Sequence, residues 1–153
     1  MSKPNSLISL YNKMTRLPFG HWLFSKAVCY KAPYFGSISP IFTRLENGRC
    51  DASFKDRRSV HNHIGTVHAI AQCNLAELCA GVMTDASLPG DMRWIPKGMT
   101  VSYLKRAKGT MHGTATPMIA SATGSVSVVP AFFTASTHML KPMKCASIGS
   151  LVT

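Results

Sequence analysis

The chain has 153 residues, 46% of them hydrophobic, which is enough to bury one core, so we expect a single domain over residues 1–153. No apolar run reaches the roughly 18 to 20 residues that cross a bilayer, which excludes a membrane-spanning helix. The formal net charge of +11 fits an anionic membrane, a phosphate-bearing ligand or a simple soluble basic protein. RNA-binding motifs and basic nucleic-acid helices are missing, so nucleic acid is not an expected partner.

The N-terminal region is basic, with six lysines and arginines and no acid before Glu46. Such a composition is compatible with a transit peptide. Apolar residues nevertheless recur at helical spacing after Asn5 and Ser6, a plausible cap: Leu7, Leu10, Tyr11, Met14 and Leu17. We therefore favour a structural amphipathic helix over a cleaved leader. A second helix is expected over residues 20–30, ended by Pro33, so that residues 1–34 form an N-terminal helical extension.

Two strands are expected over residues 39–46 and 49–55, joined by Asn47-Gly48, a strong hairpin signal in which both turn residues take positive φ. A long apolar helix then covers residues 67–83, with Thr66 as its N-cap. Further strands are expected over residues 99–103, 110–116, 126–137 and 144–152. This order predicts an α+β fold in which an antiparallel sheet wraps a long central helix.

The five cysteines are scattered, odd in number and contain no Cys-x-x-Cys pair. This usage indicates reduced thiols and a cytoplasmic protein, with Cys73 and Cys79 as small core residues.

Glu77 is the only charged residue in residues 67–83, where apolar side chains occupy nearly the whole circumference of the expected helix. A charge there costs several kcal/mol unless it is hydrogen-bonded, faces a cavity or becomes protonated. Because the chain has only six acids, we interpret Glu77 as a functional residue.

A spaced set of residues surrounds this acid: Asn62, Gly65 and His68 precede Glu77, which follows His68 by nine positions in the same helix. The set resembles the motif of hotdog-fold acyl-CoA thioesterases, and more narrowly the phenylacetate-pathway-like branch and an uncharacterised bacterial subgroup near it. The resemblance implies a hotdog core over residues 35–153 that acts as a dimer or tetramer. It further implies hydrolysis of an acyl-CoA or aryl-CoA thioester.

Thioester hydrolysis passes through an oxyanion, for which backbone N–H groups at a helix N-terminus are suitable donors. The amides near His68 and Ala69 are the expected donors, and Gly65 allows the tight turn into the helix. Glu77 lies about 180° around the helix from His68, so the two cannot serve one site within a single subunit. The resemblance therefore implies a site across a dimer interface, with Glu77 as general base or nucleophile and Asn62 orienting water or the carbonyl.

Coenzyme A would enter as part of the substrate, and no separate cofactor is expected. Basic residues are the candidates for its phosphates: Arg57, Arg58, Lys97, Lys105 and Arg106. His61, His63 and His68 resemble a metal cluster, but no cysteine or carboxylate joins them at ligand spacing, so no metal is expected.

Each member of the spaced set also has a purely structural interpretation. Glu77 could be a buried acid bonded to Asn74 or to a partner's backbone, Asn62 a turn residue, and His68 a structural histidine. The family pattern has Gly-Gly where this chain has Ala69-Ile70, which narrows the expected site. A non-catalytic acyl-CoA-binding protein of the same fold is therefore an alternative. A hotdog dehydratase and a binder of nucleic acid or anionic surfaces are lesser ones.

Overall fold

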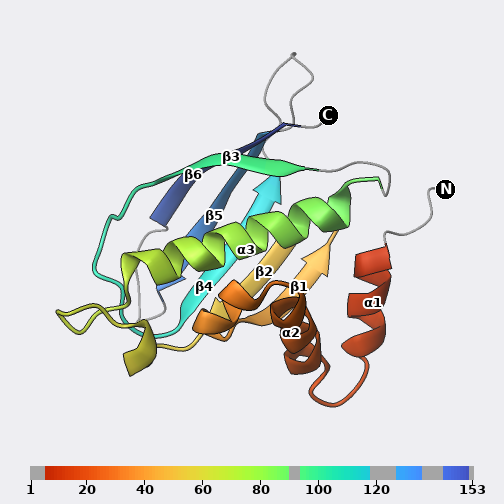
Figure 1. Cartoon of the computed structure of the whole chain (residues 1–153), viewed down its shortest axis with the longest axis horizontal. Coiled ribbons are helices and arrows are strands. Elements are labelled where there is room, and N and C mark those ends of the chain that lie inside the picture. The colour runs from red at the N-terminus through yellow and green to blue at the C-terminus, as the bar shows by residue number, and fades with distance from the viewer. Residues whose placement is uncertain (1–5, 90–93, 118–126, 136–142, 152–153) are drawn as a thin grey trace.

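The computed structural model describes residues 6–89, 94–117, 127–135 and 143–151 (Figure 1). A long helix lies across one face of a six-stranded sheet, and two shorter helices pack beside it. This arrangement confirms the predicted α+β class, with an antiparallel sheet around a long helix. No helix in the described part of the chain is long and apolar enough to cross a membrane.

The N-terminal region folds into two α-helices and a 3-10 helix: α1 (Ser6–Met14), α2 (Gly20–Lys31) and η1 (Pro33–Ile38). Both predicted helices are therefore present, although α1 ends three residues before Leu17 and its proposed cap Asn5 lies outside the described residues. Edge-to-face ring contacts from Tyr11 through Phe24 to Phe42 join α1 and α2 to the sheet.

The sheet is entirely antiparallel, with strand order β1-β2-β4-β5-β6-β3. Its strands are β1 (Ile41–Glu46), β2 (Arg49–Phe54), β3 (Ile95–Val101), β4 (Met111–Pro117), β5 (Ser127–Ala135) and β6 (Met143–Leu151). All six were predicted, but β3 begins earlier than expected and ends before Tyr103. Residues 126, 136–137 and 152 of the predicted strands lie outside the described residues.

The β1–β2 hairpin turns at Asn47-Gly48 as predicted, but only Gly48 takes positive φ, at 74°. The expectation that Asn47 would also do so is wrong. Its backbone stays in the ordinary region, so glycine alone supplies the left-handed step of this turn.

The two edges of the sheet differ in how they are covered. At β1, the Phe42 N–H donates to Ser25 Oγ at 2.9 Å, and His21 Nδ1 donates to the Phe42 carbonyl at the same distance. Both α2 side chains thus satisfy backbone groups that an edge strand would otherwise expose. The opposite edge strand, β3, contains Pro96, a residue that sheets tolerate at their edges.

The central helix α3 (Ala69–Ser87) supplies most of the core, since twelve of its residues are buried. Leu75 and Cys79 face Gly113 of β4 so closely that a Cβ atom there would lie 3.1 Å from Leu75 and 3.3 Å from Cys79 Sγ. Cys79 is a core residue as predicted, and the four cysteines whose side chains the structure describes are free thiols: Cys29, Cys50, Cys73 and Cys79.

Candidate active site

The loop before α3 is organised by Asn62. Its Oδ1 accepts the N–H groups of Ile64 at 3.1 Å and Thr66 at 3.0 Å, while its Nδ2 donates to Thr66 Oγ1 at 2.8 Å. Gly65 takes φ 73°, which favours glycine, and so completes the turn. The amide of Asn62 thus holds the loop in shape, and its role toward a substrate stays a prediction.

His68, not Thr66, is the N-cap of α3, because its Nδ1 accepts the N–H of Ile70 at 3.1 Å. The prediction that Thr66 is the N-cap is wrong. The helix begins at Ala69, three residues after Thr66, and the Thr66 hydroxyl accepts a hydrogen bond from Asn62 within the loop. Within the described contacts, the N–H groups of Ala69 and Ala71 make no hydrogen bond. These first-turn donors are the ones that a bound oxyanion could use.

A second segment is tied to this loop through Asp56. One oxygen of its carboxylate pairs with His61 Nε2, and the other accepts the Gly109 N–H at 2.7 Å. The His61 hydrogen bond and the Gly109 N–H hold the pKa of Asp56 below its ordinary value, against a smaller opposing effect of burial. Together with the bond from Val67 N–H to Ala107 O, this brings residues 105–109 beside the start of α3.

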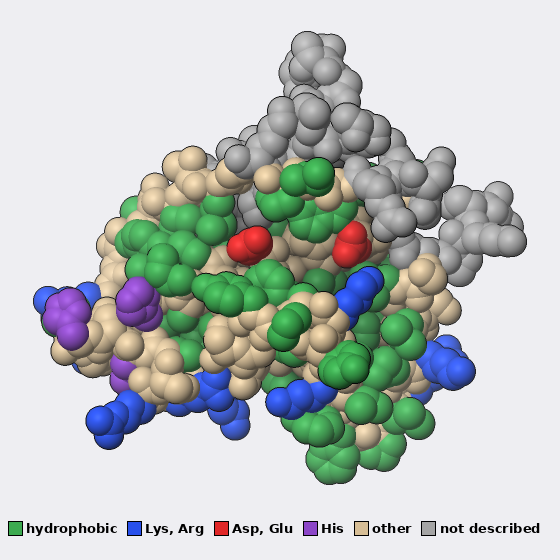
Figure 2. Space-filling view, in the orientation of Figure 1, with side chains coloured by type: hydrophobic (Ala, Val, Ile, Leu, Met, Phe, Trp, Pro, Cys, Tyr) green, Lys and Arg blue, Asp and Glu red, His purple; other side chains and the backbone are tan. Residues whose placement is uncertain are grey.

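Basic side chains gather at this end of the molecule. Figure 2 shows Lys, Arg and His side chains at the end where α3 begins. Arg58, Lys105 and Arg106 are exposed, whereas Arg57 donates from Nη2 to the Ser37 carbonyl at 2.8 Å. Lys97 lies in β3, away from this group in the chain, and its side chain lies outside the described part of the structure. Among the described residues, no three metal-ligating side chains form a cluster.

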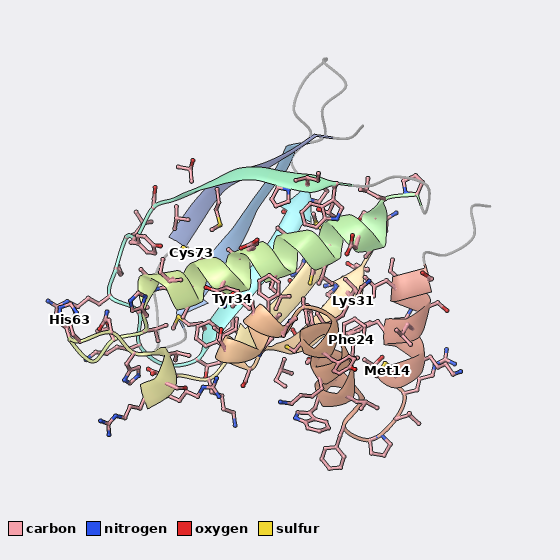
Figure 3. All side chains as sticks on the ribbon, viewed as in Figure 1. Met14, Phe24, Lys31, Tyr34, His63 and Cys73 are labelled. Carbon is pink, nitrogen blue, oxygen red and sulfur yellow. The ribbon has the colours of Figure 1, made fainter. Side chains whose placement is uncertain are left out.

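Glu77 belongs to a row of α3 residues that faces the side of β3. Cys73 Sγ lies 2.8 Å from the Tyr103 hydroxyl, just after β3. Trp94, just before β3, lies against Gly81, where a Cβ would come within 3.0 Å of the indole. Because Cys73, Glu77 and Gly81 are spaced by one helical turn, Glu77 must point to the same side. Figure 3 shows Cys73 on this side of α3 and Tyr34 on the other.

The carboxylate of Glu77 is partly exposed, and no described residue forms an ion pair with it. Asn74, the partner considered from the sequence, instead donates to Ser37 Oγ at 3.0 Å. In Figure 2, Asp and Glu side chains stand among hydrophobic ones over α3. His68 precedes the first helical residue and has an extended backbone, so its predicted place across the helix axis from Glu77 stays a prediction.

Sequence reasoning missed two parts of this arrangement. Cys73 was expected in the core, but it lies half-exposed in the Glu77 row beside Tyr103. Its helical position relative to Glu77, four residues earlier, was the available signal. Asp56 was not singled out at all, because its partner Gly109 is 53 residues away in the chain.

Known proteins with this fold include thioesterases. A crystal structure described as "genomics APC5556" is 41% identical, with TM-score 0.79, covering 96% of this chain and 97% of its own. A variant of thioesterase SAV0944 from Staphylococcus aureus is 13% identical, with TM-score 0.67, covering 78% and 98%. A variant of thioesterase PA1618 from Pseudomonas aeruginosa is 15% identical, with TM-score 0.70, covering 84% and 90%. None of the curated proteins matches the sequence.

These likenesses define the class: an α+β protein with the fold of thioesterases whose sequences are distant. Residues 20–137 match the family described as "Domain of unknown function (DUF4442)", and the chain belongs to that family. Structures of two variants of the S. aureus protein replace a glutamine and, fifteen residues further along, a glutamate with alanine.

Proposed function

We propose that this protein hydrolyses an acyl-CoA or aryl-CoA thioester, as the phenylacetate-pathway-like thioesterases do, with Glu77 as the general base or nucleophile. The observation that carries the proposal is the setting of Glu77. A carboxylate in the middle of a mostly buried helix has no ion-pair partner among the described residues and points toward the sheet edge. A carboxylate that is partly exposed and unpaired in this position is available to act on a substrate.

The spacing of two residues adds support. Asn62 and Glu77 are fifteen residues apart, as are the glutamine and glutamate replaced in the S. aureus thioesterase. An amide followed by a carboxylate at this separation places the first in the loop before the long helix and the second at the middle of that helix. We infer that Asn62 and Glu77 are the counterparts of that pair.

The proposed site needs two subunits. Glu77 faces β3, while the free N–H groups of Ala69 and Ala71 lie at the start of α3, where His68 is the N-cap. A second copy joined along the β3 edges would bring its own α3 close to Glu77. The oxyanion donors of one subunit and the carboxylate of the other could then act on one thioester carbonyl.

Arg58, Lys105 and Arg106 are the proposed contacts for the phosphates of coenzyme A, because backbone hydrogen bonds hold their segments near the start of α3. Arg57 could contribute its remaining N–H groups beside the one that it donates to Ser37. Lys97 stays a candidate phosphate contact on the basis of the sequence alone. Ile70 is exposed at the first turn of α3, and we propose that it limits the size of the group accepted there.

The decisive experiment is a panel of acyl-CoA and aryl-CoA thioesters assayed with wild type and Glu77→Gln. The amide keeps the size of the side chain but cannot act as a base, so kcat/KM should fall by about 10²–10⁴-fold. Asp85→Asn is the matched control, since Asp85 lies two turns further along the same row and accepts a hydrogen bond from Trp94. Its kcat/KM should stay within a few fold of wild type.

The same panel separates the enzyme from its closest rival, an acyl-CoA-binding protein without turnover. Calorimetric titration with coenzyme A should give similar affinity for wild type and Glu77→Gln if Glu77 acts in chemistry. Binding without any hydrolysis above background by wild type would support the rival. Equal rates for wild type and Glu77→Gln would remove Glu77 from the mechanism.

A further inference from the structure

Helix α2 carries large apolar or aromatic side chains on both of its sides. Its inner side places Phe24 and Ser25 in the core, where both are buried. Its outer side presents Trp22, Leu23 and Tyr30, of which Tyr30 is 91% exposed. Three large apolar or aromatic side chains that are exposed together make the outer side of α2 an unusual surface for a protein in water.

The turn between α1 and α2 extends this surface with Leu17 and Phe19. Phe19 has 85% of its surface exposed and φ 60°, a left-handed conformation that is costly for a bulky side chain. The next residue, Gly20, lies so close to the carbonyl oxygen of Met14 that a Cβ there would overlap it, so this turn requires glycine at that position. A strained backbone that holds an aromatic ring in solvent points to a function for that ring.

We call this region the corner surface, defined by Leu17, Phe19, Trp22, Leu23, Lys26 and Tyr30. Its charge is of one sign. Lys13, Arg16, Lys26 and Lys31 are exposed on the same two helices and their connecting turn, and the first 45 residues contain no acid. Lys26 Nζ lies 5.8 Å from the centre of the Trp22 ring, so a cation and an aromatic side chain share one position. Figure 2 shows hydrophobic side chains at the lower end of the molecule with Lys and Arg beside them.

We propose that the corner surface binds the surface of an anionic phospholipid bilayer. Exposed aromatic and leucine side chains suit the boundary between headgroups and acyl chains, and the flanking lysines and arginines suit anionic headgroups. The helices would lie on the bilayer and not cross it, as the lengths of α1 and α2 require.

Charge argues against the other occupants. A second copy that met this one through the same surface would bring like charges together. Residues 118–126 and 136–142 of the same chain contain no acid, so neither segment offers the negative charge that would complement the corner surface. A nucleic acid would neutralise the lysines but would leave Leu17, Phe19 and Leu23 without an apolar partner. A bilayer supplies both the negative charge and the apolar environment.

The test is co-sedimentation of the full chain with vesicles of phosphatidylcholine, with and without phosphatidylglycerol. We expect partitioning only into vesicles that contain phosphatidylglycerol, and a marked decrease as salt is added. Phe19→Gly should lower the partition coefficient about tenfold, since it removes one inserted ring. Because glycine accepts positive φ, this variant should fold at least as well as wild type, as thermal unfolding would show.

A double variant, Trp22→Ser with Leu23→Ser, should reduce binding further, whereas Leu104→Ser, a similarly exposed leucine outside the corner surface, should leave binding unchanged. The proposal fails if wild type binds neither kind of vesicle. It also fails if Phe19→Gly and the double variant bind vesicles as well as wild type does. It also fails if sedimentation equilibrium shows that Phe19→Gly dissociates an oligomer, because the corner surface would then join copies of the chain. These readouts do not involve Glu77, so they stand apart from the test of hydrolysis.

Discussion

At the residue scale, Asp56 is the connection on which the site loop depends. Its carboxylate accepts from both His61 and the Gly109 N–H, and Asp56→Ala would leave both donors without their acceptor. We expect the free energy of unfolding to fall by about 1–3 kcal/mol, the usual cost of removing a charged hydrogen-bonding partner. Urea unfolding at neutral pH measures this loss. Asp51→Ala, which breaks a partly exposed ion pair with the single partner Arg49, should cost less than Asp56→Ala, about 1 kcal/mol.

The pH dependence of the same contact follows from the lowered pKa of Asp56. A carboxyl group whose folded pKa is below its unfolded value stabilises the fold above the unfolded value, about 3.8 here. That contribution is lost as pH falls through the folded pKa. The difference in unfolding free energy between wild type and Asp56→Asn should therefore be present at about pH 5 and shrink below about pH 4, as Asp56 becomes protonated. A difference that grew on acidification would contradict this assignment.

The roles of single residues could be predicted from the sequence where their contacts are local. Asn62, Gly65 and Thr66 act within one turn, so their residue types and separations carry the loop conformation. Contacts such as Cys73 with Tyr103 join residues 30 positions apart, and nothing in either neighbourhood specifies the other. The capping role of His68 was missed because Thr66 is the better intrinsic cap. Its hydroxyl is taken by Asn62 before the helix begins.

At the element scale, the close approach of α3 to β4 depends on Gly113. A Cβ at that position would already lie 3.1 Å from Leu75, so the larger side chain of Gly113→Val must push α3 away from the sheet. We expect a loss of about 1–3 kcal/mol in unfolding free energy from this overpacking. Gly98→Ala in β3 meets nothing within 4 Å and should be nearly neutral.

Unfolding of both glycine variants by urea provides the comparison, with circular dichroism to check that each one folds. Equal stability of wild type and Gly113→Val would mean that α3 does not rest on β4 at this point. The periodicity of residues 110–116 predicted β4 itself. Its place under α3 could not be predicted, because strand order depends on pairings between segments far apart in the chain.

At the scale of the whole molecule, the two sheet edges suggest how copies of the chain assemble. Side chains of α2 hydrogen-bond both backbone groups of Phe42, so the β1 edge is covered at this residue. The β3 edge carries Ile95, 71% exposed, and Met99, 37% exposed. The Glu77 row of α3 faces the same side. An exposed apolar edge strand is a surface that a second strand can pair with.

If two copies join along β3, one charge on that strand should weaken both the dimer and catalysis. The Met99→Lys substitution would bury a charged side chain between the subunits. We therefore expect the dimer dissociation constant to rise by at least about tenfold. Thioester hydrolysis, measured at concentrations below that constant, should fall in parallel and recover as protein is added. Leu10→Lys on α1, at a comparably exposed position, should change neither property. A monomeric Met99→Lys protein with full activity at every concentration would mean that each subunit holds a complete site, and Glu77 would then need a partner from its own chain.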